Sequence, residues 1–171
     1  GLRPVTEEPS LQNTVDWSPD GRVVVSFLLD DAGPLRLVDV ETGETEELAG
    51  TEGLAGVASS PDGRYLAAHD FGGEADEPFQ IRLLEWQTAE WTALEGAQGG
   101  MLKWSADGQH LYFGCSDRGA CRVRPEGGDV ERVANFKGEV DWWWSVDPEG
   151  RIVRLRGLHT SDIFTWDLTF P

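Results

Sequence analysis

The sequence predicts an all-β fold built from four copies of one unit. Two observations carry this prediction: a six-residue motif that returns along the chain, and a near-constant distance between its copies. The motif is WSPDGR at Trp17, and it returns as SSPDGR at Ser59, as WSADGQ at Trp104 and, more loosely, as VDPEGR at Val146. Successive copies begin 42, 45 and 42 residues apart, and a fixed period of this length indicates a repeat protein.

Each copy of the motif predicts a tight turn between two strands. Proline presets one backbone dihedral of such a turn, aspartate hydrogen-bonds the nearby backbone, and glycine accepts a positive φ. The segments after the turns are short and rich in branched and aromatic residues, which is typical of strands; they are residues 22–29, 64–69, 109–115 and 151–156.

Further strand-like segments follow in each unit. A second set lies at residues 35–40, 79–86, 120–124 and 162–168, and a third set at residues 45–48, 91–94 and 130–134. With the strand before each turn, every complete unit has four strands. No stretch has the apolar spacing of a long amphipathic helix.

Four-stranded antiparallel sheets at this period are typical of the blades of a β-propeller. We expect one propeller domain over residues 1–171, with blades at about 11–50, 51–96, 97–136 and 137–171. The last unit lacks a fourth strand, so residues 1–10 are expected to supply the outer strand that completes a blade. Three arrangements remain open: part of a larger propeller, a two-chain eight-bladed ring, and a closed four-bladed ring.

Charge and hydropathy limit the partners. The 171 residues include 14 basic and 31 acidic side chains, for a net charge of -17, which repels phosphate backbones. No apolar run approaches the roughly 20 residues of a membrane-spanning helix. We therefore expect a protein or small-molecule ligand, no nucleic acid and no membrane insertion by this chain. A homodimer, or contact with other blades of a parent propeller, is the further expectation.

The residues that could carry chemistry are scattered. His69, His110 and His159 lie in different units, without the spacing of metal ligands. We therefore expect no cofactor, no metal and no catalytic residue. Cys115 and Cys121 flank the tip of one predicted hairpin, where they could form a disulfide in an oxidising compartment or stay free thiols in the cytosol.

Six residues are candidates for partner binding. Trp142 and Trp143 belong to a run of three tryptophans that must point to both faces of a strand, and Arg154 and Arg156 follow on the next strand at one parity. Aromatic and arginine side chains are common anchors of binding surfaces. The alternative for the arginines is cross-strand pairing with Asp or Glu. Asp16 and Lys103 occupy one aligned position beside the turn and complete the set.

The motif, the LVDV strand at residues 37–40, the TGE turn at 42–44 and the TWDL strand at 165–168 together resemble the TolB-like, WD-repeat-like propellers of bacteria. The resemblance spans residues 1–171. The third and fourth units are most similar to propeller modules attached to bacterial receptor-type Ser/Thr kinases or winged-helix regulators. This resemblance implies a sensory or protein-binding module in the periplasm or at the cell surface. The chain has no kinase signature.

These observations favour a non-catalytic scaffold that binds a protein or small ligand through its loops and central mouth, as a sensor module of a larger protein. Two alternatives stay open because fold alone does not fix function. One is a propeller hydrolase or lyase that uses axial carboxylates and histidines. The other is a structural half-propeller that assembles with itself.

Overall fold

The computed structural model describes residues 5, 12–27, 33–70, 79–115, 119–136 and 144–154. All regular structure in these residues is β. The strands of the first half are β1 (Gln12–Trp17), β2 (Val23–Phe27), β3 (Arg36–Val38), β4 (Thr45–Glu47), β5 (Leu54–Ser59), β6 (Tyr65–Asp70) and β7 (Gln80–Glu85). Those of the second half are β8 (Glu90–Gln98), β9 (Gly100–Trp104), β10 (Leu111–Cys115), β11 (Gly119–Val123), β12 (Glu131–Asn135), β13 (Trp144–Val146) and β14 (Ile152–Arg154). Within these residues, no helix is long and apolar enough to span a membrane.

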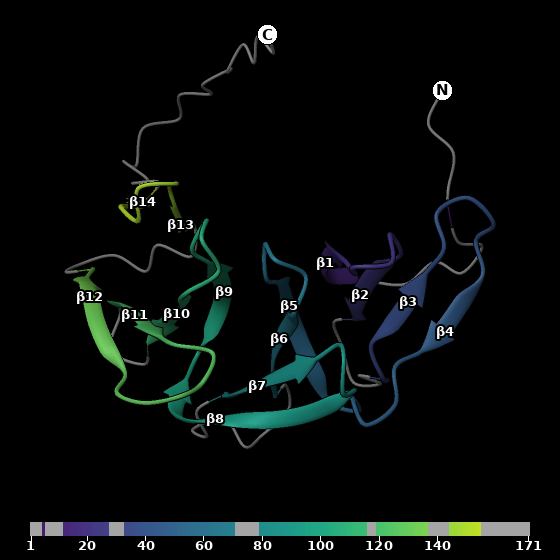
Figure 1. Ribbon diagram of the computed structural model, residues 1–171, viewed down its shortest axis with the longest axis horizontal. Coiled ribbons are helices and arrows are strands. Elements are labelled where there is room, and N and C mark those ends of the chain that lie inside the picture. Colours follow the sequence, from purple (N-terminus) through teal and green to yellow (C-terminus); the bar gives the residue numbers. More distant parts are fainter. Residues whose placement is uncertain are drawn as a thin grey trace, which may run out of the picture.

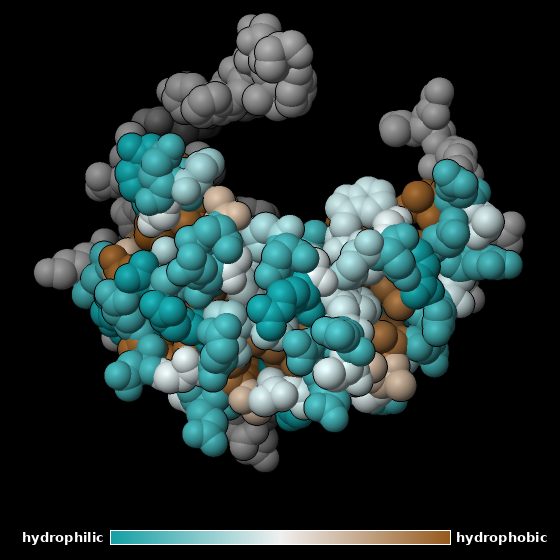
Figure 2. Space-filling view, viewed as in Figure 1, coloured by the Kyte–Doolittle hydropathy of each residue, from teal (hydrophilic) through white to brown (hydrophobic). Residues whose placement is uncertain are grey.

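The strands form successive antiparallel sheets, which we call blades 1 to 4. Strands β1–β4, β5–β8 and β9–β12 each make a four-stranded sheet in chain order, and β13 pairs with β14. The blades follow one another along an arc, with the first strand of each on its inner side (Figure 1). The surface seen in Figure 2 is largely hydrophilic, with small hydrophobic areas. The predicted strand at 162–168 lies outside the described residues, as does the predicted outer strand at 1–10 apart from Val5, which lies in a bend.

The last strand of the second blade extends slightly past the approximate expected end at residue 96. Strand β8 runs to Gln98, so the second blade ends two residues after the expected boundary at 96. The ladder between β7 and β8 shifts register between Gln80 and Arg82, and this irregularity lets Gln80 pair with Gln98. A bulge of this kind adds residues to one strand without ending the pairing.

The turns between first and second strands are built alike but differ in length. The Ser18 amide donates to the carbonyl of Arg22, four residues on, whereas the Ser60 amide donates to the carbonyl of Tyr65, five residues on. The turn of blade 3 has the same length as the turn of blade 2, and the turn of blade 4 has the same length as the turn of blade 1. The second strands are therefore offset by one residue relative to the motif. The equivalent residues at their starts are Val23, Leu66, Leu111 and Ile152.

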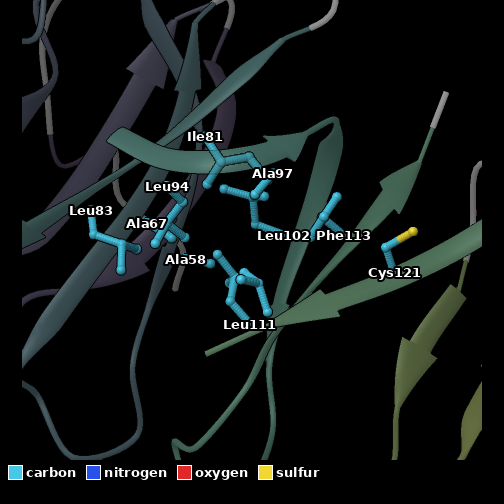
Figure 3. Close-up of a cluster of buried hydrophobic side chains, with 11 residues drawn as sticks. Ala58, Ala67, Ile81, Leu83, Leu94, Ala97, Leu102, Leu111, Phe113 and Cys121 are labelled. Atoms are coloured by element: carbon cyan, nitrogen blue, oxygen red, sulfur yellow. The ribbon is translucent and has the colours of Figure 1, made fainter. Parts of the chain in front are cut away.

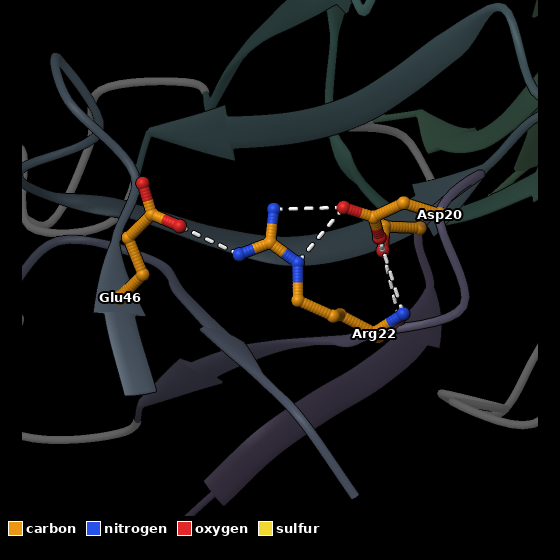
Figure 4. Close-up of polar contacts among 4 residues, drawn as sticks. Asp20, Arg22 and Glu46 are labelled. Atoms are coloured by element: carbon orange, nitrogen blue, oxygen red, sulfur yellow. Dashed lines mark hydrogen bonds and ion pairs between the residues drawn. The ribbon is translucent and has the colours of Figure 1, made fainter. Parts of the chain in front are cut away.

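The aspartate of each turn is held by hydrogen bonds. In blade 1, Arg22 Nε donates to Asp20 Oδ2 at 2.8 Å, and the same guanidinium reaches Glu46 Oε2 on β4 at 2.6 Å (Figure 4). The hydrogen bond from the Arg22 side chain, followed by that from the Ser18 hydroxyl, lowers the pKa of Asp20 to about 2. The carboxylate therefore fastens the turn to the outer strand of the same blade.

Neighbouring blades pack face to face. We call the face turned to the preceding blade the leading face, and the face turned to the next blade the trailing face. Between blades 2 and 3, side chains of the two faces point toward one another in one buried cluster (Figure 3). The trailing face of blade 2 contributes Ala58, Ala67 and Leu83, among others. The leading face of blade 3 contributes residues that include Leu102, Leu111 and Phe113. Equivalent clusters join blade 1 to blade 2 and blade 3 to blade 4.

Removal of the Phe113 side chain should test this packing. The ring is 1% exposed and lies inside the cluster between blades 2 and 3. We expect Phe113→Ala to lower the free energy of unfolding by about 3–5 kcal/mol, since it removes apolar contacts and leaves a cavity. Urea denaturation followed by circular dichroism measures the change. Thr92→Ala, on the exposed part of β8, should stay within about 0.5 kcal/mol of the parent chain. Equal midpoints for the two variants would contradict an interblade core.

The Asp20 turn predicts a stability change in acid. The folded-state pKa of about 2 lies below the ordinary value of about 3.9, so the ionised carboxylate stabilises the folded chain above about pH 4. That contribution is lost as the pH falls toward 2. Carbon NMR titration of the Asp20 carboxyl group should give the low pKa, and Arg22→Ala should raise it. In the same variant the pKa of Asp107 should not move, because it is lowered mainly by the Ser105 hydroxyl. A normal Asp20 pKa in the parent chain would refute this assignment.

Candidate functional site

The first strands have two chemically different ends. We call the end that leads into the Ser-x-Asp-Gly turns the turn end, and the end where the first strands begin the mouth end. Strands β1, β5 and β9 are neighbours along the inner side of the arc (Figure 1). A ligand could reach several blades at once only where these strands converge, so each candidate residue is assigned to one end.

Asp16 lies at the turn end and has a structural role. Its Oδ2 accepts the backbone N–H of Ser59 at 2.7 Å, and its Oδ1 accepts the N–H of Trp17 at 2.8 Å. The N–H of Ser60 is used within blade 2, in the bond to Tyr65, so the N–H of Ser59 points to the opposite side of β5. Asp16 thus satisfies a donor on the edge of the next blade.

Thr14 makes the matching contact one step along the strand. Its Oγ1 accepts the N–H of Val57 at 2.8 Å and also pairs with Ser26 Oγ at 2.8 Å. In addition, Ser59 Oγ donates to the Trp17 carbonyl at 2.6 Å. These bonds join the first strands of blades 1 and 2. Sequence reasoning missed Thr14, although its two-residue spacing from Asp16 was the available signal.

Of the other five candidates, the structure describes two, Lys103 and the backbone of Arg154. Lys103 lies near the turn end of β9, with an exposed side chain. Arg154 ends β14, where its backbone pairs with Trp144 at the mouth end. Trp142, Trp143 and Arg156 lie outside the described residues. Of the expected Arg and Trp surface, the structure describes only the backbone of Arg154, which lies at the other end of its blade from the turn.

The mouth end of blade 2 holds a buried histidine. His69, on β6, is 7% exposed. Its Nδ1 lies 3.0 Å from the carbonyl oxygen of Asp70, and its ring stacks on Phe79 with centroids 5.1 Å apart. A Cβ built on Gly56 would lie 2.2 Å from His69 Nε2, and one on Gly100 would lie 3.4 Å from it. The ring therefore lies against two first strands, and Gly56 leaves room for it.

Burial determines the charge state of His69. Desolvation lowers the pKa of the imidazole, and its contact with the Asp70 carbonyl opposes that effect only in part. The ring is therefore neutral at neutral pH. Because a carbonyl can only accept, Nδ1 carries the proton and Nε2 is left as an acceptor beside the first strands. A neutral imidazole with this tautomer can accept a hydrogen bond from a ligand or bind a metal ion.

Two further groups flank His69. Phe79 is 41% exposed, so part of its ring faces solvent. Asp70 Oδ1 accepts Arg82 Nε at 3.0 Å, and both side chains are more than two-fifths exposed. The aromatic ring and the acceptor nitrogen therefore lie at the mouth end of blade 2 on the face of Ile81, and the charged pair lies at the same end on the opposite face, with Ala68.

Irregular backbone also gathers at this end. Gly56 on β5 and Met101 on β9 occupy equivalent positions, three residues before Ser59 and Trp104, and their φ values are 66° and 58°. The pairing of both first strands with their second strands shifts register nearby. Bulges of this kind redirect side chains and occur often beside binding sites. The repeat pattern gave no signal for the positive φ of Met101.

A disulfide closes the adjacent hairpin. Cys115 and Cys121 are bonded across β10 and β11, with Cα atoms 5.9 Å apart, so the structure contains the bonded form rather than free thiols. Cys121 is buried in the core between blades 2 and 3. The crosslink anchors the mouth end of blade 3 to that core.

The residues with metal-binding chemistry do not converge in the described part of the chain. There, no group of three or more His, Cys, Asp or Glu side chains is arranged to hold a metal ion. His69 and His110 belong to different blades, and His110 lies at the turn end, where burial lowers its pKa. His159 lies outside the described residues.

Comparison with known proteins finds solved structures with a similar architecture. No protein-family model and no curated protein matches the chain. Among solved structures, TolB from Acinetobacter baumannii is similar, with a TM-score of 0.67 and 19% identity over 92% of this chain. An oligogalacturonate lyase in complex with manganese is similar with a TM-score of 0.61 and 18% identity over 84% of this chain.

The chain spans 41% and 44% of the length of these two proteins. At such identities the likeness concerns the fold. The repeat, the antiparallel sheets and this likeness agree, and the chain has a TolB-like β-propeller fold.

Proposed function

We propose that this chain is a non-catalytic binding module that contacts a protein segment or a small ligand through its mouth end. The observation that carries the proposal is the group formed by His69, Phe79, Asp70 and Arg82. Here a partly exposed aromatic ring stacks on a neutral histidine, and an exposed charged pair lies at the same end of the blade on its other face. Aromatic and arginine side chains are frequent anchors at binding surfaces.

The turn end supports the non-catalytic part of the proposal. The pKa values of Asp62 and Asp107 are lowered, mainly by hydrogen bonds from the Ser60 and Ser105 hydroxyls, as that of Asp20 is lowered mainly by Arg22. A carboxyl group with a lowered pKa is a poor proton donor at neutral pH. These carboxylates are engaged within their own turns, which suits a structural role.

Two features support a location outside the cytoplasm and a place in a larger assembly. The Cys115–Cys121 disulfide is favoured in oxidising compartments such as the periplasm or the cell surface. The chain covers less than half of each similar structure. We therefore propose that it is the sensory or protein-binding part of an extracytoplasmic assembly.

Selection of binding peptides tests the proposed site. A library of random peptides displayed on phage would be selected against the full chain, and the selected peptides would be measured by calorimetry. We expect Phe79→Ala to weaken their binding by about tenfold or more, because truncating an aromatic anchor commonly costs over 1 kcal/mol. The exposed control Thr92→Ala on β8 should leave the affinity unchanged. Peptides that bind both variants as tightly as the parent chain would show that the site lies elsewhere.

The enzymatic alternative has its own assay. The full chain would be incubated with oligogalacturonate and manganese, and the unsaturated product of a lyase would be followed by ultraviolet absorbance. The proposal predicts no product above the rate without protein. Product formation that is lost in His69→Gln and kept in Thr92→Ala would overturn the non-catalytic assignment.

A further inference from the structure

Inside the chain, blades join by one repeated contact between a leading and a trailing face. Trp104 on the leading face of blade 3 covers blade 2: its ring stacks on Tyr65, with centroids 6.2 Å apart and planes 11° apart. Its Nε1–H donates to the Ala58 carbonyl at 3.0 Å. The contact therefore combines an aromatic stack, a directed hydrogen bond and the apolar cluster beneath them.

Blade 1 presents the same kind of leading face without a cover. Trp17 and Trp104 are equivalent, since each directly precedes the serine of its turn. Trp17 is 58% exposed, and Val15, two residues before it and on the same side of β1, is 56% exposed. The equivalent residues of blade 3 are the partly buried Trp104 and Leu102, which is 5% exposed.

Blade 4 presents an uncovered trailing position. Val153 is equivalent to Tyr112 of blade 3 and Ala67 of blade 2. Each of these residues directly follows the one that pairs with the last residue before the turn, namely Ile152, Leu111 and Leu66. Ala67 is 0% and Tyr112 is 2% exposed, because the next blade covers them, whereas Val153 is 56% exposed. The described chain thus has an apolar leading face at its first blade and an exposed apolar trailing position at its last.

We propose that these two faces bind each other between two copies of this chain, with Trp17 and Val15 of one copy against the Val153 face of the other. A leading face fits a trailing face at each of the three junctions inside the chain, so the new interface continues an established one. A head-to-tail interface must close to give a finite assembly, and the proposal is that two such contacts close a ring of two copies.

Length and charge are consistent with a second copy as the occupant. One chain spans 41% and 44% of the two similar structures, so two copies approach the length of one of them. Each copy carries a net charge of -17, and the copies repel one another at long range. Added salt screens such repulsion, so an interface formed by apolar faces should persist or strengthen as the salt concentration rises.

Light scattering after size-exclusion chromatography tests the proposal on the full chain. We expect a mass of twice the 18.8 kDa of one chain, unchanged or more fully populated when salt is added. Trp17→Glu and Val153→Glu should each reduce the mass twofold, because each places a carboxylate in both interfaces of the ring. Thr92→Glu, with the same new charge on the exposed part of β8, should keep the mass of the parent chain.

Three outcomes would overturn the proposal: a monomeric parent chain, a mass that keeps growing with concentration, or a Val153→Glu variant that dimerises like the parent. Circular dichroism with urea denaturation establishes that each variant is folded. If Trp17→Glu does not fold, Trp17→Ser serves instead, since serine is the residue of blade 2 at this position. These results do not depend on the ligand site at the mouth end, because neither Trp17 nor Val153 belongs to it.

Discussion

The structure depends on the contact between the first strands of neighbouring blades. Each blade is a narrow sheet whose first strand is an edge, and an edge strand leaves backbone N–H groups without partners. Asp16 and Thr14 of blade 1 accept two such groups on β5, at Ser59 and Val57. The buried cluster between blades 1 and 2 packs beside this contact. The side chains of blade 1 therefore complete the hydrogen bonding of blade 2 and set how the two faces meet.

The two ends of the blades use their polar residues in different ways. Within the turns, side chains bond to their own turn or to the same blade, as Ser18, Asp20 and Arg22 do. At the mouth end, the backbone bulges at Gly56 and Met101, and His69 lies against the first strands with an acceptor nitrogen. A rigid turn end and an irregular mouth end suit a scaffold that presents one variable surface, since binding residues tend to lie on loops held by a rigid framework.

The sequence predicted the strands well because their signals are local and repeated. The turn motif and the β-branched segments after it placed all fourteen described strands to within a few residues. The one-residue difference between the turns of blades 1 and 2 was hidden, since it depends on which carbonyl closes the turn. The site was harder to predict. Asp16 was selected as a binding residue but bonds to Ser59, 43 residues away, and such a partner is known only once the blades are placed. His69 was noticed, yet its burial and its tautomer follow from Gly56, Gly100 and Asp70 in space.

Amide hydrogen exchange at Ser59 tests the central contact most directly. If Asp16 holds this N–H, the Ser59 amide exchanges slowly in the parent chain although it lies on the edge of a sheet. Asp16→Ala should then speed exchange at Ser59 while leaving Ser60, which donates to Tyr65 within its own blade, protected. Lys103→Ala, at the equivalent position of blade 3, serves as the control and should change neither amide. Fast exchange at Ser59 in the parent chain, or no response to Asp16→Ala, would contradict a structure in which blade 1 completes the edge of blade 2.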